Sequence, residues 1–133
     1  DLNRVVKPLV NFVSEDLSNW YIRRNRRRFW KGELDESKKS VYKVTYEVLV
    51  TLSQLLAPVS PFLAEEIYTN LTKEESVHLS DFPKCNEELI DLDVEKQMDL
   101  VRDVVSLGRN AREEANVKIR HPLSKVLLDK MKV

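Results

Sequence analysis

An apolar stripe of helical period runs along the first part of the chain and then meets arginines. At roughly 100° per residue, one face of residues 2–28 gathers Leu2, Val5, Val6, Leu9, Val10, Phe12, Val13, Leu17 and Trp20. The same face continues into Arg23, Arg24, Arg27 and Arg28. Burying an arginine without a partner is costly in free energy. We therefore predict a long first helix that extends past the end of its bundle or presents these arginines to acids or phosphates.

The basic block, residues 20–31, concentrates positive charge in a chain that is neutral as a whole. It holds five arginines, one lysine, no acid and both tryptophans, whereas the chain has 22 basic and 22 acidic residues. The rest of the chain therefore has 16 basic against 22 acidic residues. The partner that suits such a localised positive field is a polyanion.

Aromatic side chains within the basic block indicate which polyanion that is. Aromatic rings and arginine planes both stack on exposed nucleic-acid bases, and the block contains Trp20, Tyr21, Phe29 and Trp30. The alternative is a solvated basic helix end, since positive charge is favourable near the negative C-terminal end of a helix dipole. The interleaved aromatic residues favour a nucleic-acid surface.

Turn and cap residues divide the following sequence into further helices. Gly32 marks a turn, and Asp35 is suited to cap a helix over residues 36–56. That helix is apolar over a wide arc, which predicts a central position with neighbours on more than one side. Ser60 as N-cap and Pro61 at the first helical position predict a third helix that ends near residue 71. Its predicted inner face consists of Leu63, Ile67 and Leu71, with Phe62 and Tyr68 beside them.

Proline limits the start of the first helix, because it lacks a backbone donor and kinks an interior turn. We expect the well-formed part of that helix to begin near Pro8, or a bend there.

The fourth helix is predicted over residues 94–115, with an inner face of Met98, Val101, Val105, Gly108 and Ala115. It follows a long connection, residues 72–92, which we expect Val77, Leu79 and Phe82 to hold against the bundle.

The predicted fold is therefore all-α, an antiparallel bundle of about four helices with a short C-terminal strand-like extension. Residues 1–124 are expected to form a helical domain, and residues 125–133 the truncated start of an extension. The chain lacks a starting methionine and ends shortly after the strand-like run Val126-Leu127-Leu128. Both ends are expected to be cut from something larger.

Residue types that carry catalysis or bind metals are sparse. Cys85, His78 and His121 match no zinc spacing, and a single cysteine excludes an internal disulfide and suits a reducing compartment. Two glycines leave no glycine-rich phosphate loop. Glu65 and Glu66 are expected on an exposed helix side, where their usual role is solubility. We expect no catalytic residue, no metal site and no membrane span, which would need roughly 20 apolar residues.

Four segments resemble the anticodon-binding domain of isoleucyl-tRNA synthetases, in the same order. Residues 16–30, DLSNWYIRRNRRRFW, are similar to its opening. Residues 56–68, LAPVSPFLAEEIY, resemble a turn that the valyl, leucyl and isoleucyl enzymes of class I share. Residues 76–79, SVHL, and 117–124, VKIRHPLS, resemble later segments, although the isoleucyl enzymes more often have glutamine where this chain has His121. The resemblance covers nearly the whole chain.

The resemblance implies a tRNA-recognition domain of a larger enzyme. The parent would activate isoleucine with ATP and charge tRNA(Ile), as an isoleucine-tRNA ligase. This part would bind the anticodon arm without cofactor or active site, because the family's catalytic sequences, His-Ile-Gly-His and Lys-Met-Ser-Lys-Ser, are absent. The expected partners are the anticodon arm of tRNA(Ile) and the remaining synthetase domains. The expected state is a cytoplasmic monomer without membrane contact.

The predicted tRNA-binding residues are basic, with one tryptophan among them. They are Arg23, Arg24, Arg26, Arg27, Arg28, Trp30, Lys31, Arg109, Arg112, Lys118 and Arg120. A catalytic domain is the second hypothesis, opposed by the lack of a nucleophile–base or metal constellation. A structural scaffold is the third, in which the arginines would pair with Asp16, Glu33, Asp35 or Glu36. Which anticodon bases are read, and by which residues, stays open.

Overall fold

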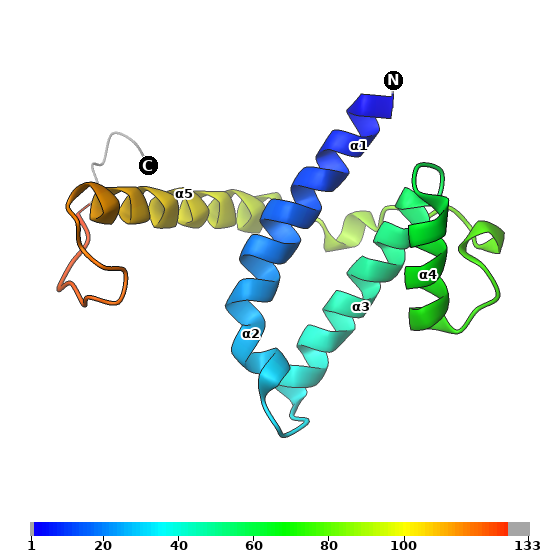
Figure 1. Ribbon diagram of the computed structural model, residues 1–133, viewed down its shortest axis with the longest axis horizontal. Helices are drawn as coiled ribbons and strands as arrows, with labels where there is room; N and C mark the ends of the chain where they lie inside the picture. Colours follow the sequence, from blue (N-terminus) through cyan, green and yellow to red (C-terminus); the bar gives the residue numbers. More distant parts are fainter. Residues whose placement is uncertain (1, 128–133) are drawn as a thin grey trace. The chain divides into compact units, whose positions relative to one another are not determined.

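Helices form the regular structure of the computed structural model, which describes residues 2–127 (Figure 1). No strand occurs within those residues, so the all-α prediction is confirmed. The chain divides into two compact units, Asp1–Lys84 and Cys85–Val133. Of the predicted strand-like extension, residues 125–127 are not a strand, and residues 128–133 lie outside the described residues. The domain boundary after residue 124 stays a prediction.

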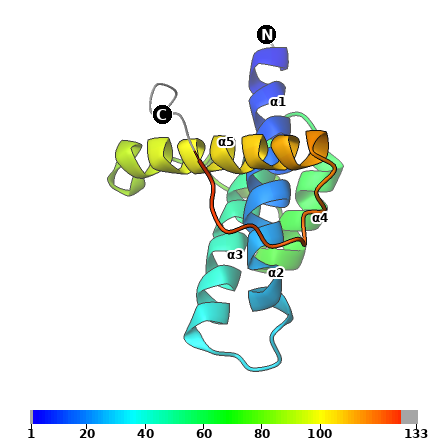
Figure 2. The same cartoon turned by 90° about the vertical axis from the view of Figure 1, so that its left-hand side faces the viewer.

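The first unit begins with one continuous helical rod of three segments. These are α1 (Leu2–Asn11), the π-helical segment η1 (Phe12–Ile22) and α2 (Arg23–Trp30). The junction residues Asn11 and Arg23 both have right-handed helical dihedrals, so the helical backbone continues without a break (Figure 2), while its axis curves between α1 and α2 (Figure 1). Pro8 lies inside α1, so the prediction that the well-formed helix begins near Pro8 is wrong, and the alternative, a bend at Pro8, stays a prediction.

The π-helical segment changes which residues share a face. Its hydrogen bonds run from i to i+5, so each turn takes about one residue more than an α-turn. The predicted stripe at constant α-helical pitch is therefore only partly retained across η1, where Trp20 is half-buried. Leu17 is buried there, whereas Phe12 and Val13 are exposed. Val5 and Val10 are exposed as well, because α1 makes its main contacts in this unit with η1, its own continuation.

A short turn reverses the chain into α3 (Glu36–Leu56), which runs back beside α2 (Figure 1). Asp35 caps α3, and its carboxylate accepts a hydrogen bond from the Lys38 amide at 2.9 Å. The same carboxylate forms an ion pair with Lys31 across the turn. On the inner side, the rings of Phe29 and Tyr42 meet edge to face at 5.4 Å between centroids. The predicted cap and the predicted start of α3 are both confirmed.

The core of the first unit lies between α3 and α4 (Pro61–Thr72). Ala64, Tyr68 and Val77 are buried there, with Val50, Leu56 and Ala57 packed against them. The predicted inner face of this helix is therefore only partly confirmed: Ile67 and Leu71 are half-buried, but Leu63 is exposed, and its neighbour Ala64 faces the core. The small Ala64 side chain lets the two helices approach closely, which a leucine would prevent. The helix ends at Lys73, which is left-handed with φ 65°.

Start signals of α4 are only partly as predicted. Pro61 takes the first helical position, but the Ser60 side chain makes no capping hydrogen bond. Ser60 contributes its carbonyl oxygen instead, which accepts from the Ala64 amide at 3.0 Å. Proline at the first position already leaves one orphan donor fewer to satisfy. The helix start is thus specified by Pro61 rather than by the serine hydroxyl.

Two side chains of the helix pair hold the segment after α4. The Glu65 carboxylate accepts hydrogen bonds from the Ser76 hydroxyl at 3.0 Å and from the Val77 amide at 2.9 Å. Gln54 donates to the Ser80 hydroxyl at 3.3 Å. This places Val77 in the core at the start of the short 3₁₀ turn Val77–Leu79 (η2). The prediction that Glu65 serves only solubility is therefore wrong.

The predicted apolar anchoring of this segment is only partly confirmed. Val77 is buried, but Leu79 and Phe82 are exposed. Hydrogen bonds from Gln54, to Ser80 and to the Asp81 carbonyl oxygen, replace the expected apolar contacts.

The second unit contains one long helix, α5 (Leu92–Glu114), after the 3₁₀ turn Glu87–Leu89 (η3). Asp91 caps it, accepting from the amides of Asp93 and Val94 at 3.1 and 3.0 Å. Its predicted inner face is not buried, and α5 contains no buried residue. The unit has no second long helix among its described residues against which that face could pack.

The cap of α3 generates a test by substitution. We expect Asp35→Ala to lower the melting temperature more than Asp35→Asn does. Asparagine keeps an acceptor for the Lys38 amide and loses only the charge that faces Lys31. Thermal unfolding of both variants at neutral pH measures the difference. Equal melting temperatures for the two variants would show that the cap acceptor contributes nothing.

The ionisation of the Asp35 carboxylate determines how the stability of the fold changes with pH. The hydrogen bond from Lys31, followed by that from the Lys38 amide, lowers the pKa of Asp35 below its ordinary 3.8. A lowered pKa stabilises the fold above the ordinary value, and this contribution is lost as pH falls through the lowered pKa. The stability difference between wild type and Asp35→Asn should therefore be full at neutral pH and shrink below pH 3.8.

Candidate nucleic-acid interface

Four arginines and a tryptophan surround an open hollow of about 430 Å³ on α2. The lining residues are Arg23, Arg24, Arg26, Arg27 and Trp30. Spacings of three and four residues place Arg23, Arg26, Arg27 and Trp30 on one side of the helix. This arrangement differs from the face predicted at constant pitch, because Arg26 and Trp30 join it and Arg28 does not.

Two of these arginines lie over indole rings. The Arg24 guanidinium carbon is 5.0 Å from the ring centroid of Trp20, and that of Arg26 is 5.9 Å from the ring centroid of Trp30. Trp20 is half-buried, whereas Trp30 is 78% exposed. Arg26 therefore covers only part of a ring that otherwise faces water.

The positive charge of this hollow is not compensated by neighbouring acids. Within residues 2–127, none of its four arginines forms an ion pair with a carboxylate. Of the three acids at the turn, Asp35 is paired with Lys31, Glu36 is paired with Lys39 at 2.8 Å, and Glu33 forms no ion pair with these arginines within residues 2–127. The internal pairing that a structural scaffold would require is thus missing for these arginines in the described part of the chain.

Arg28 has a different environment from its neighbours. Its Nε donates to the Ser37 hydroxyl at 2.8 Å, and a terminal nitrogen donates to the Ser37 carbonyl oxygen at 2.6 Å. The other terminal nitrogen donates to Asn25 Oδ1 at 2.8 Å. Two of its five N–H donors therefore join α2 to the first turn of α3, and a third is bonded within α2.

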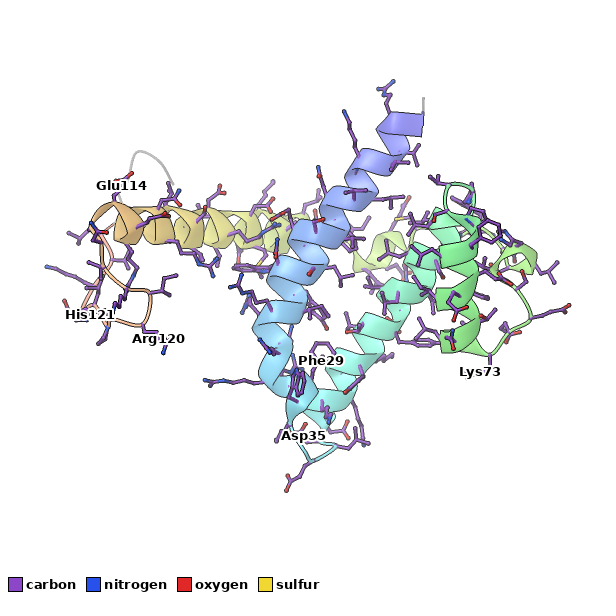
Figure 3. The ribbon with its side chains drawn as sticks, in the orientation of Figure 1. Phe29, Asp35, Lys73, Glu114, Arg120 and His121 are labelled. Carbon is purple, nitrogen blue, oxygen red and sulfur yellow. The ribbon has the colours of Figure 1, made fainter. Side chains whose placement is uncertain are left out.

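Lys31 also contributes to this joint. Its ammonium group is paired with Asp35, and its carbonyl oxygen accepts a hydrogen bond from the Lys38 side chain. Figure 3 shows Phe29 and Asp35 at the same end of the helix pair. Two of the predicted tRNA-binding residues, Arg28 and Lys31, thus hold the reversal of the chain beneath the basic face.

The second unit carries the remaining predicted site residues at the C-terminal end of α5. Arg112 donates from one terminal nitrogen to the carbonyl oxygens of Lys118 and His121, at 3.1 and 2.9 Å. Lys118 and Arg120 flank Ile119 along an open hollow of about 550 Å³. Arg109 is exposed on α5, one turn before Arg112. Arg112 therefore holds the turn that presents Lys118 and Arg120, the latter labelled in Figure 3.

The turn after α5 is specified by Asn116, the residue at which the sequence predicts that turn to begin. Asn116 is left-handed with φ 52°. Its amide donates to the Glu113 carbonyl oxygen at 3.0 Å, and the Val117 amide donates to that of Arg112 at 2.8 Å. This pair of bonds is the Schellman motif. Asparagine tolerates the left-handed conformation, so its place at a helix end was a usable signal.

Metal and membrane features are missing from the described residues. Within residues 2–127, no three histidine, cysteine, aspartate or glutamate side chains are grouped in a way that could hold a metal ion. No helix in that range is sufficiently long and apolar to span a bilayer.

The contacts of Arg28 predict that it stabilises the fold, unlike its neighbour Arg27. We expect Arg28→Ala to lower the free energy of unfolding by about 1 kcal/mol, since it breaks partly exposed charge-assisted hydrogen bonds. Arg27→Ala removes an exposed side chain and should change it by less than about 0.5 kcal/mol. Denaturant unfolding of both variants measures the contrast. Equal stabilities would mean that the Ser37 contacts do not hold the joint.

Comparisons with known proteins identify the family. A family model described as the anticodon-binding domain of tRNA ligase matches residues 1–127. Among curated relatives, an isoleucine–tRNA ligase of Dehalococcoides mccartyi (strain CBDB1) is 53% identical over 116 residues, 83% of this chain. One of Chlamydia trachomatis serovar D is 46% identical over 131 residues, 96% of the chain. One of Clostridium novyi is 49% identical over 126 residues, 90% of the chain.

These relatives are much longer than the region they share with this chain. The matched region covers 11% of the length of the Dehalococcoides protein and 12% of that of the other two. The family match itself extends over nearly all of this sequence and includes both compact units. The chain therefore belongs to the family of anticodon-binding domains of tRNA ligases.

Proposed function

We propose that this domain binds the anticodon arm of tRNA(Ile) as part of a longer isoleucine–tRNA ligase. The observation that carries the proposal is the hollow on α2, which is lined by Trp30 and by four exposed arginines without carboxylate partners in the described chain. Family membership supports an RNA partner. The names of the similar ligases support isoleucine as the amino acid that the cognate tRNA carries.

The predicted contact residues have two different tasks in this proposal. Exposed residues contact RNA: Arg23, Arg24, Arg26, Arg27 and Trp30 in the first unit, and Arg109, Lys118 and Arg120 in the second. Arg28, Lys31 and Arg112 act mainly by holding the backbone that presents these residues, because their donors are bound to protein oxygens. Phosphate contacts supply affinity and orientation, and contacts to bases supply specificity.

The parent enzyme in this proposal activates isoleucine with ATP and transfers it to tRNA(Ile). This domain contributes no catalytic residue and no cofactor site to that reaction. We place the parent in the cytoplasm, as a monomer in which this domain adjoins the remaining synthetase domains.

Salt dependence tests whether the partner is RNA. With about six phosphate contacts, affinity for tRNA should fall about a thousandfold between roughly 50 and 200 mM salt. Arg27→Ala should reduce the slope of log K against log salt by about one unit, if Arg27 contacts one phosphate. Lys43→Ala is the matched control, because it removes the same charge from α3, where Lys43 pairs with Glu47 at 3.9 Å. Filter binding with a tRNA(Ile) transcript measures the affinity of the wild-type chain and of both variants at each salt concentration.

Two outcomes of the salt experiment would contradict the proposal. A flat salt response of the wild-type chain would favour the structural scaffold. Equal slopes for Arg27→Ala and Lys43→Ala would mean that the α2 face is not the contact surface. A non-cognate tRNA transcript in the same assay tests the specificity for tRNA(Ile).

Exchange of pyrophosphate into ATP tests the division between this domain and its parent. With isoleucine present, this chain alone should show exchange only at background level, because it lacks the family's catalytic sequences. Addition of an intact isoleucine–tRNA ligase to the same assay is the positive control. Exchange above background by purified chain would mean that the domain assignment is wrong.

A further inference from the structure

We infer that the hollow on α2 receives one unpaired base of an RNA loop, which stacks on Trp30 and releases Arg26 to a phosphate. The inference rests on the function proposed above and specifies what that surface recognises. It is carried by the size of the hollow, the high exposure of the Trp30 ring and the position of Arg26 over the indole.

The hollow is suited in size and charge to a single nucleotide. Its volume of about 430 Å³ lies within the range of small-ligand sites, roughly 300–1,000 Å³. Its polar lining consists of guanidinium groups, which bind phosphate in a bidentate geometry. A nucleotide combines the two features that this lining recognises, a flat aromatic ring and a negative charge.

Trp30 provides the stacking surface, and its neighbour Phe29 does not. The Phe29 ring is packed edge to face against Tyr42 at an interplanar angle of 83°, so it belongs to the joint between α2 and α3. The Trp30 ring is 78% exposed and has Arg26 as its aromatic-face contact in the described chain. Two successive aromatic residues thus have opposite roles, one internal and one available to a ligand.

Arg26 must move for a base to stack on the ring face that it covers. Its guanidinium carbon is 5.9 Å from the indole centroid, whereas a base between two planes needs about 7 Å, twice the roughly 3.4 Å stacking repeat. No carboxylate among residues 2–127 holds Arg26 in place. An exposed cation–π contact is weaker than base stacking on an aromatic side chain. The base therefore takes the face of Trp30, and the released guanidinium pairs with the adjacent phosphate.

This geometry recognises an unpaired base without distinguishing which base it is. Every base has a π-face, so stacking tolerates any sequence. Bases within an A-form duplex are stacked on each other and cannot reach the indole. The ligand class is therefore a single-stranded loop nucleotide, and identity must be read elsewhere on the domain.

Abasic substitution of the RNA tests the inference directly. The probes are a tRNA(Ile) transcript and derivatives with one abasic site at each position of the anticodon loop in turn. One position should be distinctive: its abasic derivative should bind wild-type protein about 5- to 150-fold more weakly, which corresponds to one lost stacking contact. Exchanging that base for any other should have little effect on affinity.

Substitution of the protein completes a double-mutant cycle. Trp30→Ala should weaken binding of the intact tRNA by a similar factor. This variant should bind the intact tRNA and the distinctive abasic derivative with equal affinity, since both changes remove the same contact. Trp30→Phe should retain most of the affinity. Phe29→Leu is the matched control, because it alters the neighbouring aromatic residue without touching the hollow, and it should keep the sensitivity to the abasic site.

Indole fluorescence gives a second readout. The chain has two tryptophans, so Trp20→Phe leaves Trp30 as the sole emitter. Binding of tRNA(Ile) should quench its emission, except with the distinctive abasic derivative. In the same background, Arg26→Ala should keep the quenching and reduce the salt slope by about one unit. If Trp20→Phe fails to fold, the binding cycle in the wild-type background still decides the question.

The proposed function and this inference can fail separately. Salt-dependent binding of tRNA with equal affinities for wild type and Trp30→Ala, and no sensitive loop position, would overturn the base-stacking inference and leave the proposed function intact. Absence of tRNA binding at any salt concentration would overturn the proposed function and the inference with it. Strong sensitivity to the identity of the stacked base would also overturn the inference.

Discussion

The hydrogen bonds of Arg28 to Ser37 join the basic helix to the rest of the first unit. They connect residues nine positions apart across a turn, and the ion pair between Lys31 and Asp35 closes the same reversal. Because both partners of each contact lie at this corner, α2 is held against α3 there without burying its other arginines. An exposed cationic face can therefore be presented by a helix that is itself firmly attached. Charged side chains thus serve both the fold and the surface of one short helix.

An arginine also holds the backbone through hydrogen bonds at the end of α5. Arg112 satisfies two carbonyl oxygens of the following turn, and Asn116 adopts the left-handed conformation that reverses the chain. Guanidinium groups are well suited to this role, because a single planar group can reach several acceptors at once. In each unit, then, an arginine bound to protein oxygens stabilises the backbone that carries exposed basic residues. We regard this division between holding and contacting residues as the organising feature of the proposed RNA surface.

Local sequence signals predicted where helices begin and end better than they predicted which side of each helix is buried. The bounds of α3, the cap at Asp35 and the start of α4 at Pro61 follow from short-range preferences, and the structure confirms them. The inner face of α4 was predicted from leucine spacing and was wrong at Leu63, because the close approach of α3 favours the small Ala64. The role of Glu65 was missed for a similar reason: its partners, Ser76 and Val77, lie eleven and twelve residues further along the chain.

The sequence by itself determined that the chain is helical, that its positive charge is concentrated in residues 20–31, and that this block resembles one family. Composition, periodicity and motif order are properties of the sequence, so they can be recognised without knowledge of the tertiary structure. Only the tertiary structure decided which arginines are free. Arg27 and Arg28 are adjacent and chemically identical, yet one lines an open hollow and the other is bound to Ser37. Their difference arises from the π-helical phase of η1 and from the position of α3, and both depend on how distant backbone segments pack.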